Sequence, residues 1–145
     1  MPLLDLTFPA GALSPDVRDT LADDLAAALL RAERAPDTEF FRTITWTFLH
    51  ELPDAHVRAN GRPAQNFRLL ATVPQGALSD RRKQEFVEAA TLIVREAAGI
   101  PEEEVLRVWV LVNEVPEGNW GAAGGIVRFE NLKAAAEHER EQAPA

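Results

Sequence analysis

The chain of 145 residues contains no cysteine. Disulfide bonds, thiolate nucleophiles and cysteine metal sites are therefore excluded, and the absence of cysteine favours a cytoplasmic location. Positive charge is also scarce, because 15 lysine and arginine residues stand against 23 aspartate and glutamate residues and give a formal net charge of −8. Such a surface repels a phosphate backbone, so we expect no nucleic-acid partner.

Long apolar runs are missing as well. No stretch is long enough to cross a bilayer, and no basic segment followed by an apolar one opens the chain, so we expect neither a membrane partner nor a secretory signal. The three histidines, His50, His56 and His138, lack the spacing of metal ligands. The glycine-rich stretch 121–125 lacks the pattern of a phosphate loop. We therefore expect no metal and no cofactor, in a single domain that spans residues 1–145.

What the chain does have is a proline directly behind the initiator methionine. Aminopeptidases normally remove a methionine that precedes a small residue, which would leave Pro2 with a free secondary amine. An ordinary α-amino group has a pKa of about 7.7–8.0, and burial or nearby cations lower it further because both disfavour the charged form. Pro2 is therefore the one candidate for a base that works near neutral pH.

Two sequence motifs recur in the same order in both halves of the chain. Residues Pro9–Ser14 match Pro74–Ser79 at five of six positions, 65 residues apart. Residues Trp46–Asp54 align with Trp109–Glu117, 63 residues apart. The pattern indicates an internal duplication, with repeats at about residues 2–64 and 65–129 and a helical or frayed tail at 130–145.

Each repeat is predicted to be a strand, a helix and a second strand. Leu4, Leu6 and Phe8 alternate with polar residues as in a half-buried strand. Ser14 and Ser79 are predicted helix N-caps, and residues 43–49 and 105–112 are predicted closing strands, with a short edge strand at 126–129. Two such units give an α+β fold built from β-α-β units, with a four-stranded mixed sheet and two helices on one face. The opposite face needs cover, which oligomerisation would supply.

These residues resemble the tautomerase superfamily, whose members share a β-α-β building block and a catalytic amino-terminal proline. Residues 113–125, with Trp120 before a glycine cluster, look like the hairpin of 4-oxalocrotonate tautomerase that lines a neighbour's active site. The length and duplication resemble the fused members, such as cis-3-chloroacrylic acid dehalogenase and malonate semialdehyde decarboxylase. The resemblance implies Pro2 as the catalytic residue, a small-molecule carboxylate substrate and a homotrimer.

One departure from the family concerns anion binding. The family carries arginine in the turn after the first strand of a repeat, whereas this chain has Gly11-Ala12-Leu13 and Gly76-Ala77-Leu78 there. The paired arginines of the dehalogenase and the decarboxylase are missing. A guanidinium group binds a carboxylate through two parallel hydrogen bonds, so other arginines are expected to hold the substrate. The residues predicted to bind substrate are Arg58, Arg62, Arg68, His56 and Trp120.

The resemblance implies a tautomerase, an isomerase in which neutral Pro2 moves a proton on a small 2-oxo or enol acid. Two alternatives stay open. A protonated Pro2 would instead act as a general acid in hydration, dehalogenation or decarboxylation of a small unsaturated or 3-oxo acid. The missing arginines also fit a non-catalytic trimer with a binding or structural role.

Overall fold

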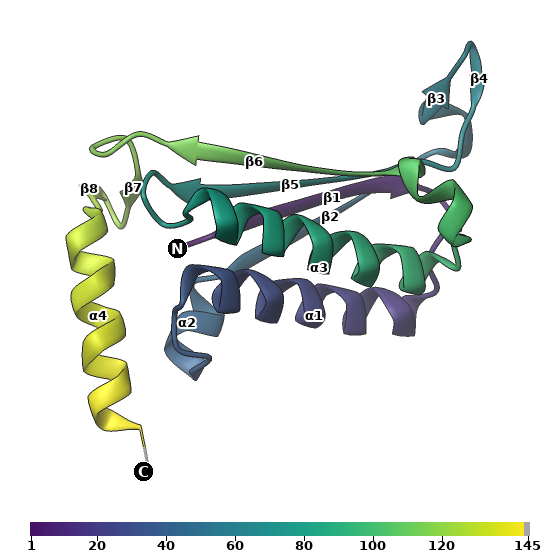
Figure 1. The fold of residues 1–145 in the computed structure, drawn as a ribbon. Coiled ribbons are helices and arrows are strands. Elements are labelled where there is room, and N and C mark those ends of the chain that lie inside the picture. Colours follow the sequence, from purple (N-terminus) through teal and green to yellow (C-terminus); the bar gives the residue numbers. More distant parts are fainter. Residues whose placement is uncertain (144–145) are drawn as a thin grey trace.

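A computed structural model describes residues 1–143 and shows, within them, one four-stranded mixed sheet with two long helices on one face (Figure 1). The predicted fold class is confirmed. The strand order is β2-β1-β5-β6. The elements of these layers are β1 (Leu3–Pro9), α1 (Pro15–Glu33), α2 (Glu39–Thr43), β2 (Trp46–Leu52), β5 (Phe67–Pro74), α3 (Asp80–Ala98) and β6 (Val108–Val115).

The strand register explains why the sheet is mixed. β1 runs parallel to β2, with Leu3 opposite Trp46, and β5 runs parallel to β6. The two parallel pairs meet through β1 and β5, which are antiparallel, with Leu3 opposite Thr72 and Thr7 opposite Arg68. A long helix joins the two strands of each parallel pair, as a parallel connection requires. The amino end of β1 therefore lies at the opposite end of the sheet from the amino end of β5.

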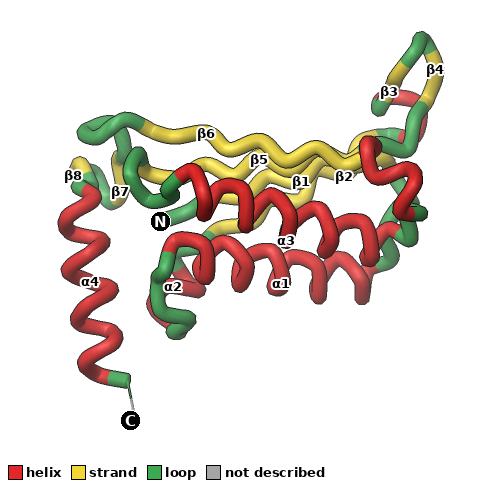
Figure 2. Tube along the Cα trace, viewed as in Figure 1, coloured by secondary structure: helices red, strands yellow, loops and turns green. Residues whose placement is uncertain are grey.

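Two small hairpins and a carboxy-terminal helix complete the chain. Figure 2 shows the hairpins at opposite ends of the sheet, and the last helix beside the β7–β8 hairpin. Residues 144 and 145, the end of the predicted tail, lie outside the described residues. The remaining elements are η1 (Asp54–His56), β3 (Arg58–Ala59), β4 (Arg62–Pro63), η2 (Glu102–Arg107), β7 (Gly121–Ala122), β8 (Gly125–Ile126) and α4 (Phe129–Gln142).

Local chemistry fixes where the long helices begin and end. The Ser14 hydroxyl accepts a hydrogen bond from the Val17 N–H (3.4 Å), and the Ser79 hydroxyl accepts one from the Arg82 N–H (3.3 Å), so both predicted N-caps are confirmed. Gly99 ends α3 in the left-handed region (φ 66°), where glycine pays no steric penalty.

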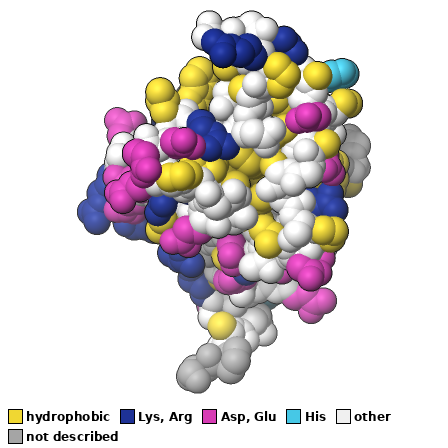
Figure 3. Space-filling model, turned by 90° about the vertical axis from the view of Figure 1, so that its right-hand side faces the viewer, with side chains coloured by type: hydrophobic (Ala, Val, Ile, Leu, Met, Phe, Trp, Pro, Cys, Tyr) yellow, Lys and Arg dark blue, Asp and Glu magenta, His cyan; other side chains and the backbone are white. Residues whose placement is uncertain are grey.

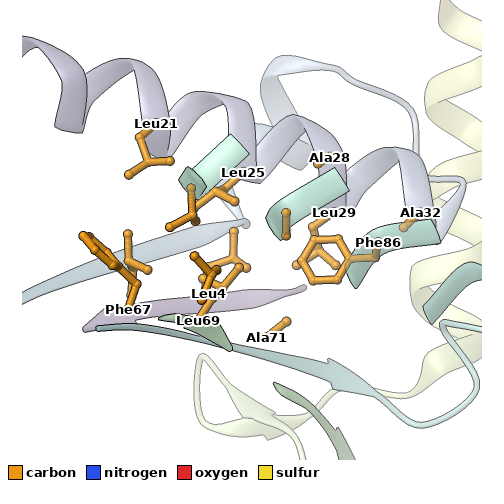
Figure 4. Close-up of a cluster of buried hydrophobic side chains, with 14 of the residues drawn as sticks. Leu4, Leu21, Leu25, Ala28, Leu29, Ala32, Phe67, Leu69, Ala71 and Phe86 are labelled. Carbon is orange, nitrogen blue, oxygen red and sulfur yellow. The ribbon is translucent and has the colours of Figure 1, made fainter. Parts of the chain in front are cut away.

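The core lies between the sheet and the two helices. Alternate residues of β1 and β5 are fully buried against α1 and α3, as the strand periodicity requires. Figure 4 shows the leucines of α1 and Phe86 of α3 pointing toward Leu4 and Leu69 of the sheet. The fully buried side chains of this layer include Leu4, Leu6, Phe8, Leu21, Leu25, Leu29, Leu69, Ala71, Val73, Phe86, Ala90 and Val94.

The opposite face of the sheet is left uncovered by the described residues, and it carries both apolar and polar side chains, with His50 beside Asp5 and Arg68 beside Thr7. Trp46 and Trp109, on the two outer strands, are 61% and 62% exposed, and Phe48 and Leu111 are exposed beside them. Large apolar side chains exposed together on one face are typical of a protein–protein interface. Among the described helices, none is long and apolar enough to cross a membrane.

Three predicted strand boundaries are wrong. Residues 39–43 form the short helix α2, because Thr38 caps it and Phe41 is buried in a second small cluster with Leu30 and Ala136, so β2 begins only at Trp46. Residues 105–107 belong to η2, and β6 begins at Val108. The predicted edge strand at 126–129 is reduced to Gly125–Ile126, since Phe129 already starts α4.

Candidate active site

Pro2 lines a cavity of about 610 Å³ at one end of the sheet. Its ring is fully buried, and its carbonyl oxygen accepts a hydrogen bond from the Trp46 N–H (3.2 Å), which ties the start of β1 to the start of β2. Apolar side chains of both outer strands and of the β7–β8 hairpin form the walls. The lining comprises Met1, Pro2, Leu3, Ile44, Trp46, Thr72, Val115, Asn119, Trp120, Gly121, Ala122 and Ala123.

The β7–β8 hairpin brings Trp120 to this cavity. The strands of the hairpin pair through Gly121 and Ile126, and the central residues Ala123 (φ 52°) and Gly124 (φ 81°) both have positive φ, as the tightest hairpin turns require. The Val127 N–H donates to the Trp120 carbonyl (2.8 Å) and closes the base of the hairpin. The structure therefore places Trp120 and Pro2 on the same cavity.

The predicted anion-binding residues lie at the other end of the sheet. A second cavity, of about 550 Å³, is lined by Arg58, His56 and Arg68 together with Arg107 and Trp109. Figure 3, which faces this end of the molecule, shows Lys and Arg atoms gathered at its top, where the β3–β4 hairpin stands in Figure 1.

The partners of these arginines differ. The Arg58 guanidinium donates to the Ala55 and Gly61 carbonyls (3.1 and 2.7 Å), so it also stabilises its own turn. The Arg68 guanidinium donates only to the Thr7 hydroxyl (3.3 Å) among the described residues. Arg68 therefore keeps most of its hydrogen-bond donors available for an anion.

Within one chain, Pro2 and these arginines are far apart. Thr7 is opposite Arg68 in the β1–β5 pair, so five strand residues, or about 16 Å, separate Pro2 from the level of Arg68. Arg62 is exposed on β4 and lines neither of these cavities. The structure thus brings together Pro2 and Trp120, and separately Arg58, Arg68 and His56.

Sequence reasoning missed a charged group beside the amino terminus. A third cavity, of about 280 Å³, is lined by Met1, Glu33 and Arg82 and by residues of α4. Burial raises the pKa of the Glu33 carboxyl to about 7, although the terminal amine and Arg82 act in the opposite direction. Burial likewise lowers the pKa of the Met1 amine, and the Glu33 charge partly opposes that shift.

The missed residues carry a weak signal in the sequence. α1 and α3 each have 19 residues and start 65 positions apart. At that spacing Glu33 corresponds to Ala98, and Arg82 corresponds to Val17. Each residue thus places a charge where the other half of the chain has an apolar residue, which marks a local difference between the two halves.

Part of the chain matches a known protein family. A family model named Tautomerase, described as tautomerase enzyme, matches residues 71–130. No curated protein matches the chain. Among solved structures, Pt0534 inactivated by 2-oxo-3-pentynoate has a TM-score of 0.74 at 23% identity and covers 92% of this chain and 98% of its own.

Two further structures share the fold. A symmetric trimer of a fused 4-OT has a TM-score of 0.72 at 20% identity, over 93% of this chain and 98% of that chain. N1, a member of the cis-3-chloroacrylic acid dehalogenase family, has a TM-score of 0.76 at 22% identity, over 98% and 92%. Residues 71–130 thus match the tautomerase family model directly, and nearly the whole chain shares the fold of these solved structures.

Proposed function

We propose that this protein is a tautomerase that uses the amine of Pro2, freed by removal of Met1, as a general base on a small 2-oxo or enol acid. The observation that carries the proposal is the position of Pro2, which is fully buried and lines a largely apolar cavity together with Trp120. A cavity of about 610 Å³ lies in the usual size range of small-ligand sites.

The surroundings of the amine suit a base. Burial lowers the pKa of the α-amino group that stands at this place in the unprocessed chain, and the same desolvation would act on the Pro2 amine. The neutral nitrogen takes a proton from an enol hydroxyl or from an acidic α-carbon, and the resulting ammonium returns it elsewhere on the conjugated system. The reaction moves only one proton and one double bond of the substrate.

The substrate carboxylate needs a cation that the Pro2 cavity of one chain does not line. In our proposal, Arg68 supplies it from a neighbouring copy in a homotrimer, with Arg58, Arg62 and His56 nearby. Two observations support this arrangement: Trp46, Phe48, Trp109 and Leu111 are exposed on the open face of the sheet, and a fused 4-OT of the same fold is a symmetric trimer. Trp120 would cover the substrate ring or chain.

A second candidate function is favoured by Glu33. A carboxylate near the terminal amine stabilises the ammonium form, so Pro2 could work as a general acid in hydration, dehalogenation or decarboxylation. The pH dependence of kcat/KM separates the two reactions. Activity that rises through the pKa of the amine marks a base, and activity that falls through it marks an acid.

The test combines mass spectrometry, labelling and a substitution. The purified chain is expected to lack Met1 and to tautomerise phenylenolpyruvate. Pro2→Ala should lower the rate of that reaction about a hundredfold or more. Pt0534 is inactivated by 2-oxo-3-pentynoate, so we expect this ynone acid to add to the Pro2 nitrogen. The adduct would carry the whole mass of the reagent, because conjugate addition releases no leaving group.

Retention of Met1 would contradict the proposal, since the Pro2 nitrogen would then be an amide. An unchanged rate in Pro2→Ala would remove the proline mechanism. Loss of labelling in Pro2→Ala, with folding verified by circular dichroism, is the matching control. A processed chain that neither reacts nor turns over any enol or unsaturated acid would leave the non-catalytic binding role.

A further inference from the structure

Met1 lines two cavities at the amino-terminal end of β1. One is the cavity of about 610 Å³ that Pro2 and Trp120 also line, and the other is the cavity of about 280 Å³ that Glu33 and Arg82 also line. Pro2 lines only the first. In the processed chain, the Pro2 nitrogen therefore faces the space that Met1 occupied, between its own cavity and Glu33.

Glu33 is the last residue of α1, and one of its carboxylate oxygens is deeply buried. Although the side chain as a whole is only half-buried, Oε1 is shielded from solvent and has no hydrogen-bond partner among the described residues. A buried carboxylate oxygen without a partner is unfavourable by roughly 1–3 kcal/mol or more. Such a group is well placed to receive a donor that arrives with processing or with substrate.

The other charged groups on this cavity do not take up that oxygen. The Arg82 guanidinium donates to the Ala32 and Ala77 carbonyls (3.3 and 3.0 Å) and to the Ser79 hydroxyl (3.2 Å). The Arg140 guanidinium donates to the Arg34 carbonyl. The remaining charged groups on the wall are Arg34, Lys133 and Glu137. Arg82 thus lies near Glu33 and supports the ends of α1 and α3, while the Glu33 Oε1 stays unpaired.

We infer that Glu33 is a positioning residue for the Pro2 amine, whose carboxylate faces the nitrogen of the processed chain and stabilises the ammonium that forms when Pro2 takes a proton. The inference rests on the proposed function only in assigning that proton transfer to Pro2. The proton passes from substrate to the Pro2 nitrogen and back, and Glu33 forms no covalent bond. Glu33 opposes the desolvation that otherwise weakens the base.

A direct titration of the amine tests this role. The chain is labelled with ¹⁵N-proline, removal of Met1 is verified by mass, and the Pro2 nitrogen is followed by NMR across pH. We expect Glu33→Gln to lower the pKa of the Pro2 amine by about one unit, because a nearby carboxylate favours the ammonium form. Glu33→Asp, which keeps the charge, should stay within a few tenths of the parent value.

The matched control is Glu137→Gln, which removes an exposed carboxylate from the wall of the same cavity. We expect it to shift the amine pKa far less than Glu33→Gln. An unchanged or higher amine pKa in Glu33→Gln would overturn the inference. Should Glu33→Gln fail to fold, Glu33→Ala serves in its place, because it also removes the charge and alanine suits the last turn of a helix. An unchanged or higher amine pKa in Glu33→Ala would likewise overturn the inference.

The two proposals fail separately in this design. The titration reads the amine without any turnover, so it stands whether or not the enzyme acts on phenylenolpyruvate. A lowered amine pKa in Glu33→Gln, together with an unchanged rate in Pro2→Ala, would keep the inference and reject the proline mechanism. The reverse pair of results would reject the role of Glu33 alone.

Discussion

At the scale of single residues, burial of Glu33 makes the stability of the fold depend on pH. Its pKa rises from 4.5 to about 7 in the folded chain. Between these values the native state holds a proton that the unfolded chain has released. The stabilisation of the fold by protonated Glu33 is therefore fully present below pH 4.5 and is lost as the pH rises through 7. The free energy of unfolding falls by roughly 3 kcal/mol in total over this range.

This sign gives a prediction for Glu33→Gln, which removes the titration but keeps the shape. Relative to the parent, the variant should gain stability steadily from pH 4.5 to pH 7 and should differ little below that range. Urea midpoints at fixed protein concentration, measured at half-unit pH steps, give the comparison. Parallel curves for parent and variant would show that Glu33 ionises freely in the folded chain.

The residues of the candidate site differ in how far their positions can be predicted from the sequence. Pro2 and Trp120 are placed by local features, because Pro2 directly precedes β1 and Trp120 directly precedes a hairpin whose turn contains Gly124. The structure places both on one cavity. Glu33 and Arg82 come together only because the end of α1 packs beside the start of α3. A periodic pattern predicts which face of a helix is buried, but it does not predict which end of another helix packs beside it.

At the scale of elements, α1 and α3 have the same length and both begin with a serine N-cap. The two serine hydroxyls differ in how many hydrogen bonds they accept. The Ser14 hydroxyl accepts one hydrogen bond, from the Val17 N–H. The Ser79 hydroxyl accepts two, from the Arg82 N–H and from the Arg82 guanidinium (3.2 Å). Ser79 therefore both begins α3 and holds the arginine that lies beside Glu33.

The pair provides a prediction with an internal control. Ser14→Ala should reduce the free energy of unfolding by about 1 kcal/mol, as expected for the loss of an N-cap. Ser79→Ala should reduce it by about 1 kcal/mol more, because the Arg82 guanidinium also loses a partner. Urea unfolding of the two variants in parallel measures the difference. Equal losses would mean that the guanidinium finds water or another acceptor at no cost.

Element boundaries were predicted well where capping chemistry decides them and poorly where tertiary packing does. Ser14 and Ser79 are predicted N-caps, and the structure begins α1 and α3 directly after them. The β-branched residues Thr43 and Ile44 favoured a strand, yet burial of Phe41 against Leu30 and Ala136 draws that segment into α2. A contact between α1, α2 and α4 cannot be derived from a local pattern.

At the scale of the whole molecule, the sheet face opposite the helices decides how complete the site is. Its exposed residues Trp46, Phe48, Trp109 and Leu111 come from both outer strands. Trp46 lines the Pro2 cavity, and Trp109 lines the arginine cavity at the other end. Because both cavities border this face, a trimer that covers it can bring one chain's Pro2 next to another chain's Arg68.

Mixed trimers test this arrangement. The Pro2→Ala and Arg68→Ala chains should each be inactive alone. By analytical ultracentrifugation each should have a mass about three times the 16.0 kDa of one chain. If each site takes Pro2 from one copy and Arg68 from the next, unfolding and refolding an equal mixture should restore about a quarter of the parent activity, since that share of sites receives two intact residues. Arg68 is exposed and donates only to Thr7, so its removal should leave folding intact. A mixture of Pro2→Ala with Pro2→Ala,Arg68→Ala is the control and should stay inactive, whereas no recovery in the first mixture would mean that both residues must come from one chain.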